Sequence, residues 1–198
     1  MRHAEPQSAV DRVLADTALS ERGREQARSL AVELAPLRFR GVLSSPMARA
    51  RETAELLADG LRLAVEFEPL LLEGALGALQ GLPLDAARAR FPEHFRVGSS
   101  VMARLAASGE TAPGGESRAD FRARACAAAE RLRAELARDG VEPLLVVGHG
   151  GLFNAALQLL LGLPPSDLVP FGFDHCGVLR VLRYLEEPAF GPFAMLRF

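Results

Sequence analysis

Two short motifs at opposite ends of the chain carry residue types that can bind and transfer an anionic group. Arg2-His3 opens the sequence, and Gly148-His149-Gly150-Gly151 follows an apolar run far downstream. A neutral imidazole is a nucleophile, and an arginine guanidinium binds phosphate through a planar fork of donors that stays charged at any working pH. Together the two motifs indicate a site for a phosphoryl group.

Composition limits the class of protein and its partners. The 198 residues show no break in composition, which predicts one domain spanning 1–198. The formal net charge of −2 provides no general attraction for polyanions, so neither nucleic acid nor an anionic membrane is an expected partner. Cys126 and Cys176 lack metal-ligand spacing and are predicted to be reduced thiols. No signal peptide or membrane-spanning run is recognisable, and we expect a cytoplasmic location.

Strand-like and helix-like segments alternate along the chain. This alternation predicts an α/β fold, a three-layer sandwich in which helices flank a mostly parallel central sheet. The expected helices cover 20–34 with Ser20 as N-cap, a segment opening at Pro46, and 152–161, and the expected strands cover 41–45, 143–149 and a hairpin of 177–184 with 193–198.

The two candidate motifs fall where such a fold binds ligands. In an open α/β sheet, ligands collect beyond the carboxyl ends of the strands, where the N-termini of helices point inward. Arg49 lies in the first helical turn after one strand, and His149 lies at the start of the helix after another. Both residues can therefore face one point, where the backbone N–H of Gly150 is also available to an anion.

Six segments, in order along the chain, resemble the motifs of the histidine phosphatase superfamily, which has the phosphoglycerate-mutase-like fold. They are Arg2-His3-Ala4-Glu5, the helix segment 19–27 (LSERGREQA), Ser44-Ser45-Pro46-Met47-Ala48-Arg49-Ala50 with Thr53-Ala54, Leu71-Leu72-Glu73 with Gly77 and Gly81, the segment 113–117 (PGGES), and Gly148-His149-Gly150-Gly151. The resemblance implies that His3 is the histidine that becomes phosphorylated and that Glu73 is the proton donor. It also places Arg2, Arg49, His149 and Gly150 around the phosphoryl group.

The resemblance implies a phosphoric monoester hydrolase, a phosphatase that acts on small phosphomonoesters through a phosphohistidine at His3. Arg2 and Arg49 would supply the positive charge, so no metal ion or cofactor is expected. The same two charges should lower the pKa of His3 and keep its ring nucleophilic in mildly acidic solution. The alternatives are a cofactor-dependent phosphoglycerate mutase, a non-catalytic binding member of the fold and a protein-phosphohistidine phosphatase. The expected partner is a small phosphorylated metabolite, and a homodimer is left open.

The residues between Glu73 and His149 are expected to determine which substrate binds. We predict a helical lid insertion at approximately 82–117, from which Phe91 or Phe95 could contact the leaving group. Glu116 and Ser117 are expected to shape a loop and to cap a helix that begins near Arg118.

The chain departs from the family pattern at several positions. Ala4 replaces the usual glycine, and Ala9 stands where many members have an asparagine that contacts phosphate. The family also has an apolar strand directly before the Arg-His pair, and we expect such a strand to be encoded upstream of Met1. His94 and His175 match no motif and are interpreted as structural or surface residues.

Overall fold

The computed structural model describes residues 1–7, 12–13, 15–95, 112–138, 142–163, 171–183 and 193–197. The α-helices are α1 (Glu21–Leu34), α2 (Ala48–Leu61), α3 (Leu84–Arg90), α5 (Arg118–Leu136) and α6 (Gly150–Leu160), and the short 3₁₀ helices are η1 (Pro69–Leu71), η2 (Gly77–Leu79) and η3 (Pro92–Phe95). The strands are β1 (Gly41–Ser44), β2 (Val65–Phe67), β3 (Leu144–Val147), β4 (Leu179–Arg183) and β5 (Phe193–Arg197).

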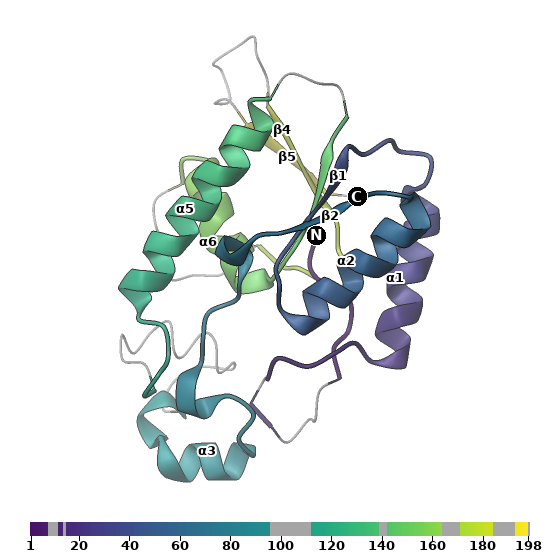
Figure 1. Ribbon diagram of the computed structural model, residues 1–198. Helices are drawn as coiled ribbons and strands as arrows, with labels where there is room; N and C mark the ends of the chain where they lie inside the picture. Colours follow the sequence, from purple (N-terminus) through teal and green to yellow (C-terminus); the bar gives the residue numbers. More distant parts are fainter. Residues whose placement is uncertain are drawn as a thin grey trace.

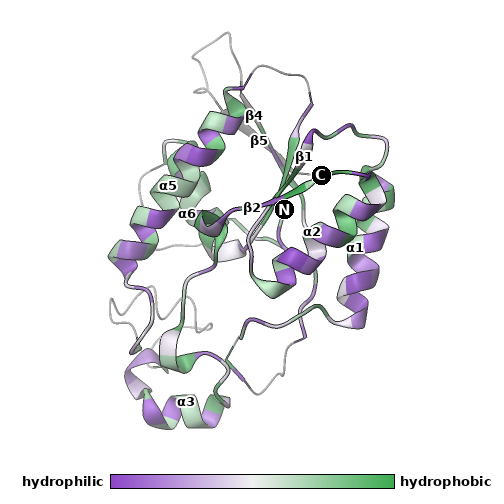
Figure 2. Ribbon diagram, in the orientation of Figure 1, coloured by the Kyte–Doolittle hydropathy of each residue, from purple (hydrophilic) through white to green (hydrophobic). Residues whose placement is uncertain are grey.

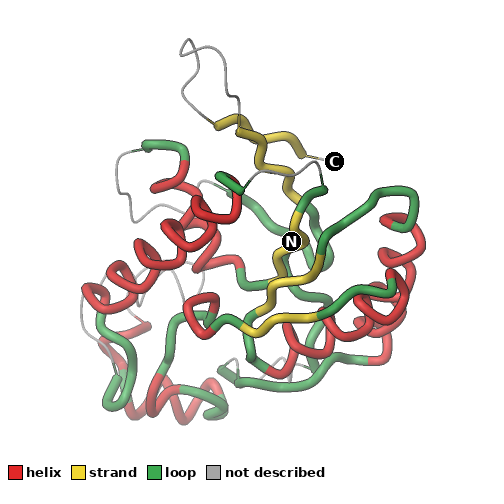
Figure 3. Tube along the Cα trace, turned by 45° about the horizontal axis from the view of Figure 1, so that its top comes forward, coloured by secondary structure: helices red, strands yellow, loops and turns green. Residues whose placement is uncertain are grey.

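A parallel sheet with the strand order β2-β1-β3 forms the centre of the molecule. Helices α1 and α2 cover one of its faces and α5 and α6 cover the other, as Figures 1 and 3 show from two directions. This arrangement confirms the predicted α/β sandwich. β4 and β5 pair antiparallel, as predicted for the hairpin, although its connecting residues lie outside the described part.

The alternation of side chains along β1 explains why both faces of the sheet are covered. Val42 packs with Ala50 and Leu57 of α2, whereas the next residue, Leu43, packs with Leu152 of α6 and with Ala125 of α5. Successive residues of a strand point to opposite faces, so a continuous apolar run buries both. Figure 2 shows the same pattern, with apolar colour along β1 and α6 and a largely polar α1.

Local signals fix where the helices begin. Ser20 and Ser117 cap α1 and α5 as predicted, because their side chains accept the N–H groups of Gly23 and Asp120. Helix α2 begins at Ala48 instead of the predicted Pro46. The Ser45 hydroxyl accepts the N–H of Met47, which forms a turn before the helix.

Residues Met1–His3 lie between the end of β3 and the segment that precedes β4. Arg2 forms a parallel bridge with Gly148, and its N–H donates to the carbonyl of Gly177, which precedes β4. These three residues are thus paired on both sides, and the upstream strand stays a prediction. Helix α1 packs closely against Glu5, which follows these three residues. A Cβ on Gly23 of this helix would lie 2.1 Å from the carbonyl oxygen of Glu5, so only glycine fits there.

A small lobe built by η2, α3 and η3 lies apart from the sheet in Figure 1. Its core contains Val13, Leu79, Phe91 and Ala112. The lobe includes the first part of the predicted lid, but residues 96–111 lie outside the described part, as does Ala9. No helix in the described ranges is long and apolar enough to cross a membrane.

Candidate active site

The backbone around His3 fixes the position and the protonation of its ring. The His3 N–H donates to the carbonyl of Gly148 (3.0 Å), and the His3 carbonyl accepts from Cys176 (3.4 Å). Ring atom Nδ1 lies 2.7 Å from the carbonyl oxygen of Ala4. Because a carbonyl only accepts, Nδ1 carries the ring proton and Nε2 has the free lone pair.

Arg49 contacts that lone pair directly. Its Nε donates to Nε2 of His3 over 3.1 Å, and its side chain is only 1% exposed. The nearest carboxylate is that of Asp16, at 3.5 Å and itself partly exposed. Burial lowers the pKa of Arg49 and Asp16 raises it, but a guanidinium stays charged in proteins. Because a buried charge is favourable only when it is paired, Arg49 is suited to binding a further anion.

Arg2 provides a second cation on the same site. Its Nη1 donates to the carbonyl of Phe173 over 2.7 Å. Burial lowers the pKa of Arg2, while the carboxylates of Glu73 and Asp174 raise it. Glu73 also raises the pKa of Arg49, which means that this carboxylate acts electrostatically on both arginines.

His149 lies next to His3, with 5.2 Å between the ring centroids, and is completely buried. Its Nε2 is 2.9 Å from the hydroxyl of Ser45, whereas Nδ1 has no hydrogen-bond partner among the described residues. Burial lowers the pKa of His149 from 6.5 to about 2 and that of His3 to about 3, and the charge of Arg49 acts in the same direction. Both rings are therefore neutral at pH 7.

Glu73 binds the N-terminus of α6. Its carboxylate accepts the N–H groups of Gly151 (3.0 Å), Leu152 (3.1 Å) and Gly74 (3.1 Å), which suits an anion at the positive end of a helix. A Cβ on Gly151 would lie 2.6 Å from Oε1 of Glu73, so the approach requires glycine. Gly150, the predicted anion donor, is the first residue of this helix.

The structure therefore brings together all the residues that the sequence predicted for the site. Two arginines and two neutral imidazoles surround a point at the carboxyl ends of β1 and β3, and an acid bound to α6 acts on both cations. Chemically, this set can bind a dianion, attack it from His3 Nε2 and exchange a proton through Glu73. No group of three His, Cys, Asp or Glu side chains that could hold a metal ion occurs in the described ranges.

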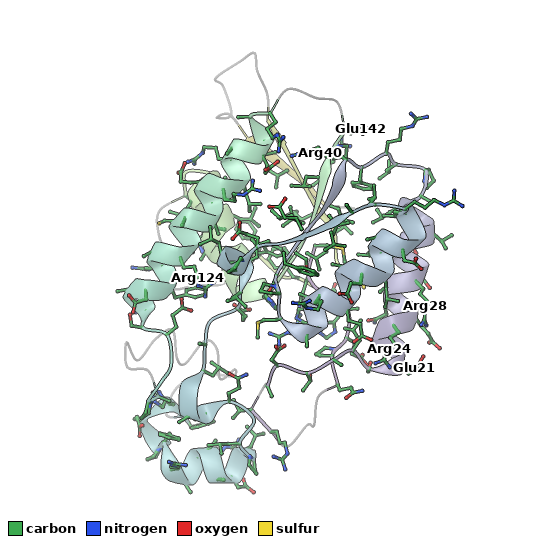
Figure 4. The ribbon with its side chains drawn as sticks, in the orientation of Figure 1. Glu21, Arg24, Arg28, Arg40, Arg124 and Glu142 are labelled. Atoms are coloured by element: carbon green, nitrogen blue, oxygen red, sulfur yellow. The ribbon has the colours of Figure 1, made fainter. Side chains whose placement is uncertain are left out.

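Sequence reasoning missed Arg124 of α5, which anchors the loop that carries Glu73 (Figure 4). Its guanidinium donates to both carboxylate oxygens of Glu116 (2.8 and 2.5 Å). It also donates to the carbonyls of Leu70 (3.1 Å), Leu72 (2.5 Å) and Glu73 (3.4 Å). Glu116 thus helps to shape the loop, as predicted, by holding this arginine.

His175 was predicted as a structural or surface residue, and the structure places it beside His3. Its ring centroid lies 5.6 Å from that of His3, so three histidines meet at the site. Burial and the charge of Arg2 lower the pKa of His175. No motif marks this residue, because only the fold returns the segment before β4 to Met1–His3.

The other residues singled out in the sequence lie in the small lobe. His94 is buried beside Phe91, with 6.2 Å between the ring centroids. Phe91 is buried in the core of the lobe, and Phe95 packs against it. Contacts of either phenylalanine with a leaving group stay a prediction.

Comparisons with known proteins identify the family of this chain. A family model described as histidine phosphatase superfamily (branch 1) matches residues 1–191. A probable phosphoglycerate mutase of Yersinia enterocolitica is 31% identical over 173 residues, which are 87% of this chain and 76% of that protein. A mycobacterial glucosyl-3-phosphoglycerate phosphatase superposes with a TM-score of 0.72 and 32% identity, covering 91% of this chain and 86% of that chain. The α-ribazole phosphatase of Shigella flexneri, at 24% identity, shares the fold with a TM-score of 0.78, covering 93% and 89% of the two chains.

Proposed function

Because this chain belongs to the histidine phosphatase superfamily, we propose that it hydrolyses small phosphomonoesters through a phosphohistidine formed on His3. One observation carries this proposal. The Nδ1–H of His3 is committed to the carbonyl of Ala4, and Nε2 therefore offers its lone pair between two arginines. A neutral nucleophile inside a cationic site suits a substrate that is itself a dianion.

In the first step, the phosphate oxygens bind Arg2, Arg49 and His149. The guanidinium of Arg49 stops donating its hydrogen bond to His3 Nε2 and donates to a substrate oxygen instead. Nε2 then attacks phosphorus in line with the leaving oxygen. The N–P bond forms, the P–O bond to the alcohol breaks, and the departing oxygen takes a proton from Glu73, whose carboxylate binds this proton when the substrate dianion enters the site. The bond from Nδ1–H to Ala4 stabilises the positive charge that develops on the ring.

In the second step, water attacks phosphorus from the position that the alcohol has left. Glu73, now a carboxylate, takes a proton from this water, the N–P bond breaks, and inorganic phosphate leaves. His3 is restored as a neutral ring and Glu73 as an acid. The two arginines compensate the charge of the phosphoryl group throughout, so the scheme needs no metal ion.

Replacement of His3 tests the proposal. His3→Asn keeps an amide donor for the Ala4 carbonyl and removes Nε2, so the variant should fold but release no phosphate from a panel of phosphomonoesters. The native protein, quenched during turnover, should hold acid-labile, base-stable phosphate on His3. Turnover by His3→Asn at the native rate, or phosphate bound at another residue, would refute the scheme.

The mutase activity is a second candidate, because the Yersinia enterocolitica relative is named a probable phosphoglycerate mutase. A mutase returns the phosphoryl group to its substrate and must exclude water from the phosphohistidine. Isomerisation of 3-phosphoglycerate, measured with and without 2,3-bisphosphoglycerate, separates the two activities. Phosphate release that exceeds isomerisation under both conditions would favour the phosphatase.

A further inference from the structure

The tautomer of His149 decides whether this residue can bind an anion. The ring is completely buried and neutral at pH 7, so one of its two nitrogens carries a proton and the other does not. Nδ1 has no partner among the described residues, and Nε2 contacts the hydroxyl of Ser45. With a proton, Nδ1 is a donor for a phosphate oxygen. Without one, it presents a lone pair that repels the anion.

The hydrogen bonds of Ser45 identify the tautomer. The hydroxyl oxygen accepts the N–H of Met47 (3.3 Å) and lies 2.9 Å from Nε2 of His149. If Nε2 carried the proton, this buried oxygen would receive two hydrogen bonds, and its own proton would find no acceptor in the described part of the chain. If the hydroxyl donates to Nε2, the Nδ1–H of His149 is the one group of this pair without a partner among the described residues, whereas the Nε2–H form leaves both the hydroxyl proton and the Nδ1 lone pair unpaired. Since each buried unpaired polar group is unfavourable, donation from the hydroxyl to Nε2 is preferred.

We propose that Ser45 is a positioning residue that holds His149 in the Nδ1–H tautomer, so that the ring donates a hydrogen bond to the transferring phosphoryl group. The proposal rests on the proposed function for the identity of that anion. It explains how a neutral histidine contributes to phosphate binding, because the donor is set by a neighbour and needs no positive charge. Ser45 itself is held in place, since its backbone N–H donates to the carbonyl of Val147 (3.0 Å).

The neighbouring residue provides a matched control. Ser44 is as completely buried as Ser45, but its hydroxyl donates to the carbonyls of Ser45 (3.0 Å) and Ala50 (3.2 Å). Ser44→Ala and Ser45→Ala each remove one buried hydroxyl from the same turn. Only Ser45→Ala removes the partner of His149 Nε2.

The tautomer can be measured in the free protein labelled with ¹⁵N-histidine, because protonated and unprotonated ring nitrogens differ strongly in ¹⁵N chemical shift. At pH 7, the native protein should show His149 protonated at Nδ1 only. Ser45→Ala should show a mixture of tautomers or the Nε2–H form, and Ser44→Ala should keep the native form. Orthovanadate, an analogue of the transferring phosphoryl group, should bind Ser45→Ala about 10- to 100-fold more weakly, by analogy with removal of the hydrogen-bond partner of a metal-binding histidine.

Three results would overturn the inference: a native His149 protonated at Nε2, a Ser45→Ala variant with native tautomer and vanadate affinity, or an equal loss in Ser44→Ala. The native spectrum keeps the test valid even if Ser45→Ala fails to fold. Neither measurement needs turnover. A protein with the expected tautomer but no phosphatase activity would therefore refute the proposed function and leave the role of Ser45 standing.

Discussion

Replacing Arg124 with methionine should destabilise the protein and weaken catalysis together. Methionine keeps most of the length of the side chain but removes every donor that holds Glu116 and the carbonyls of the loop at Leu70, Leu72 and Glu73. The side chains of Arg124 and Glu116 are 17% and 16% exposed, so water can replace only some of the lost hydrogen bonds. The loop that carries Glu73 would then be less well positioned against α6.

The size of the effect follows from this burial. Breaking a buried ion pair by removing one partner costs about 3–5 kcal/mol, and an exposed pair contributes at most about 1 kcal/mol. For this mostly buried pair we expect a loss of about 3 kcal/mol in the free energy of unfolding. In a chain of 198 residues this corresponds to a melting temperature lower by roughly 6–12 °C. Because Glu73 is the acid in the proposed chemical step, kcat should fall more than KM rises.

Urea denaturation and steady-state kinetics on matched variants test this expectation. Arg133→Met is the control on the same helix, since Arg133 is 40% exposed and pairs with Glu130 at the surface, and it should change stability by less than about 0.5 kcal/mol. Adding Glu116→Gln to Arg124→Met should recover part of the lost stability, because no unpaired carboxylate is then left. An Arg124→Met variant within about 0.5 kcal/mol of the native protein would refute the reasoning.

Three further predictions concern acidity, a glycine and metal ions. Burial lowers the pKa of His3 to about 3 and of His149 to about 2, so between pH 6.5 and about 3 the unfolded chain binds protons that the folded one does not. The free energy of unfolding should therefore decrease as the pH is lowered, by about 2 kcal/mol per ring between pH 7 and pH 5. The loss of activity in acid should coincide with unfolding. An equal melting temperature at pH 7 and pH 5 would contradict this. Gly151→Ala places a Cβ 2.6 Å from the Glu73 carboxylate and should reduce kcat on the order of 100-fold, whereas Gly41→Ala, whose Cβ meets nothing closer than 3.7 Å, should retain native kcat. Chelation with EDTA should leave turnover unchanged, and activity restored only by an added divalent ion would show that the positive charge of the site is insufficient.

The parts of the fold that the sequence predicted are those encoded by neighbouring residues. Ser20 caps α1 through a bond to Gly23 only three residues away, and the apolar run 144–147 forms β3 because both of its faces are covered. The residues predicted for the site lie together because their motifs follow the strands of a parallel sheet, whose carboxyl ends meet at one edge.

The missed features depend on residues that are distant in sequence. Arg124 reaches carbonyls 51 to 54 residues earlier in the chain, and a backbone acceptor leaves no trace in the amino-acid sequence. His175 joins the site only because the segment before β4 pairs with Met1–His3. Arginines and histidines of this kind look like ordinary surface residues until the packing of the elements is known.

The hydrogen bond from Arg49 to His3 has a consequence for selectivity in the cell. The Nε2 lone pair of His3 accepts this hydrogen bond, and the ring is 3% exposed. Alkylating or acylating compounds that lack negative charge have no means of drawing the guanidinium away from it. In the proposed mechanism, an anion that takes over this contact frees the lone pair of His3, so unwanted chemical modification of the ring should be slow until substrate binds.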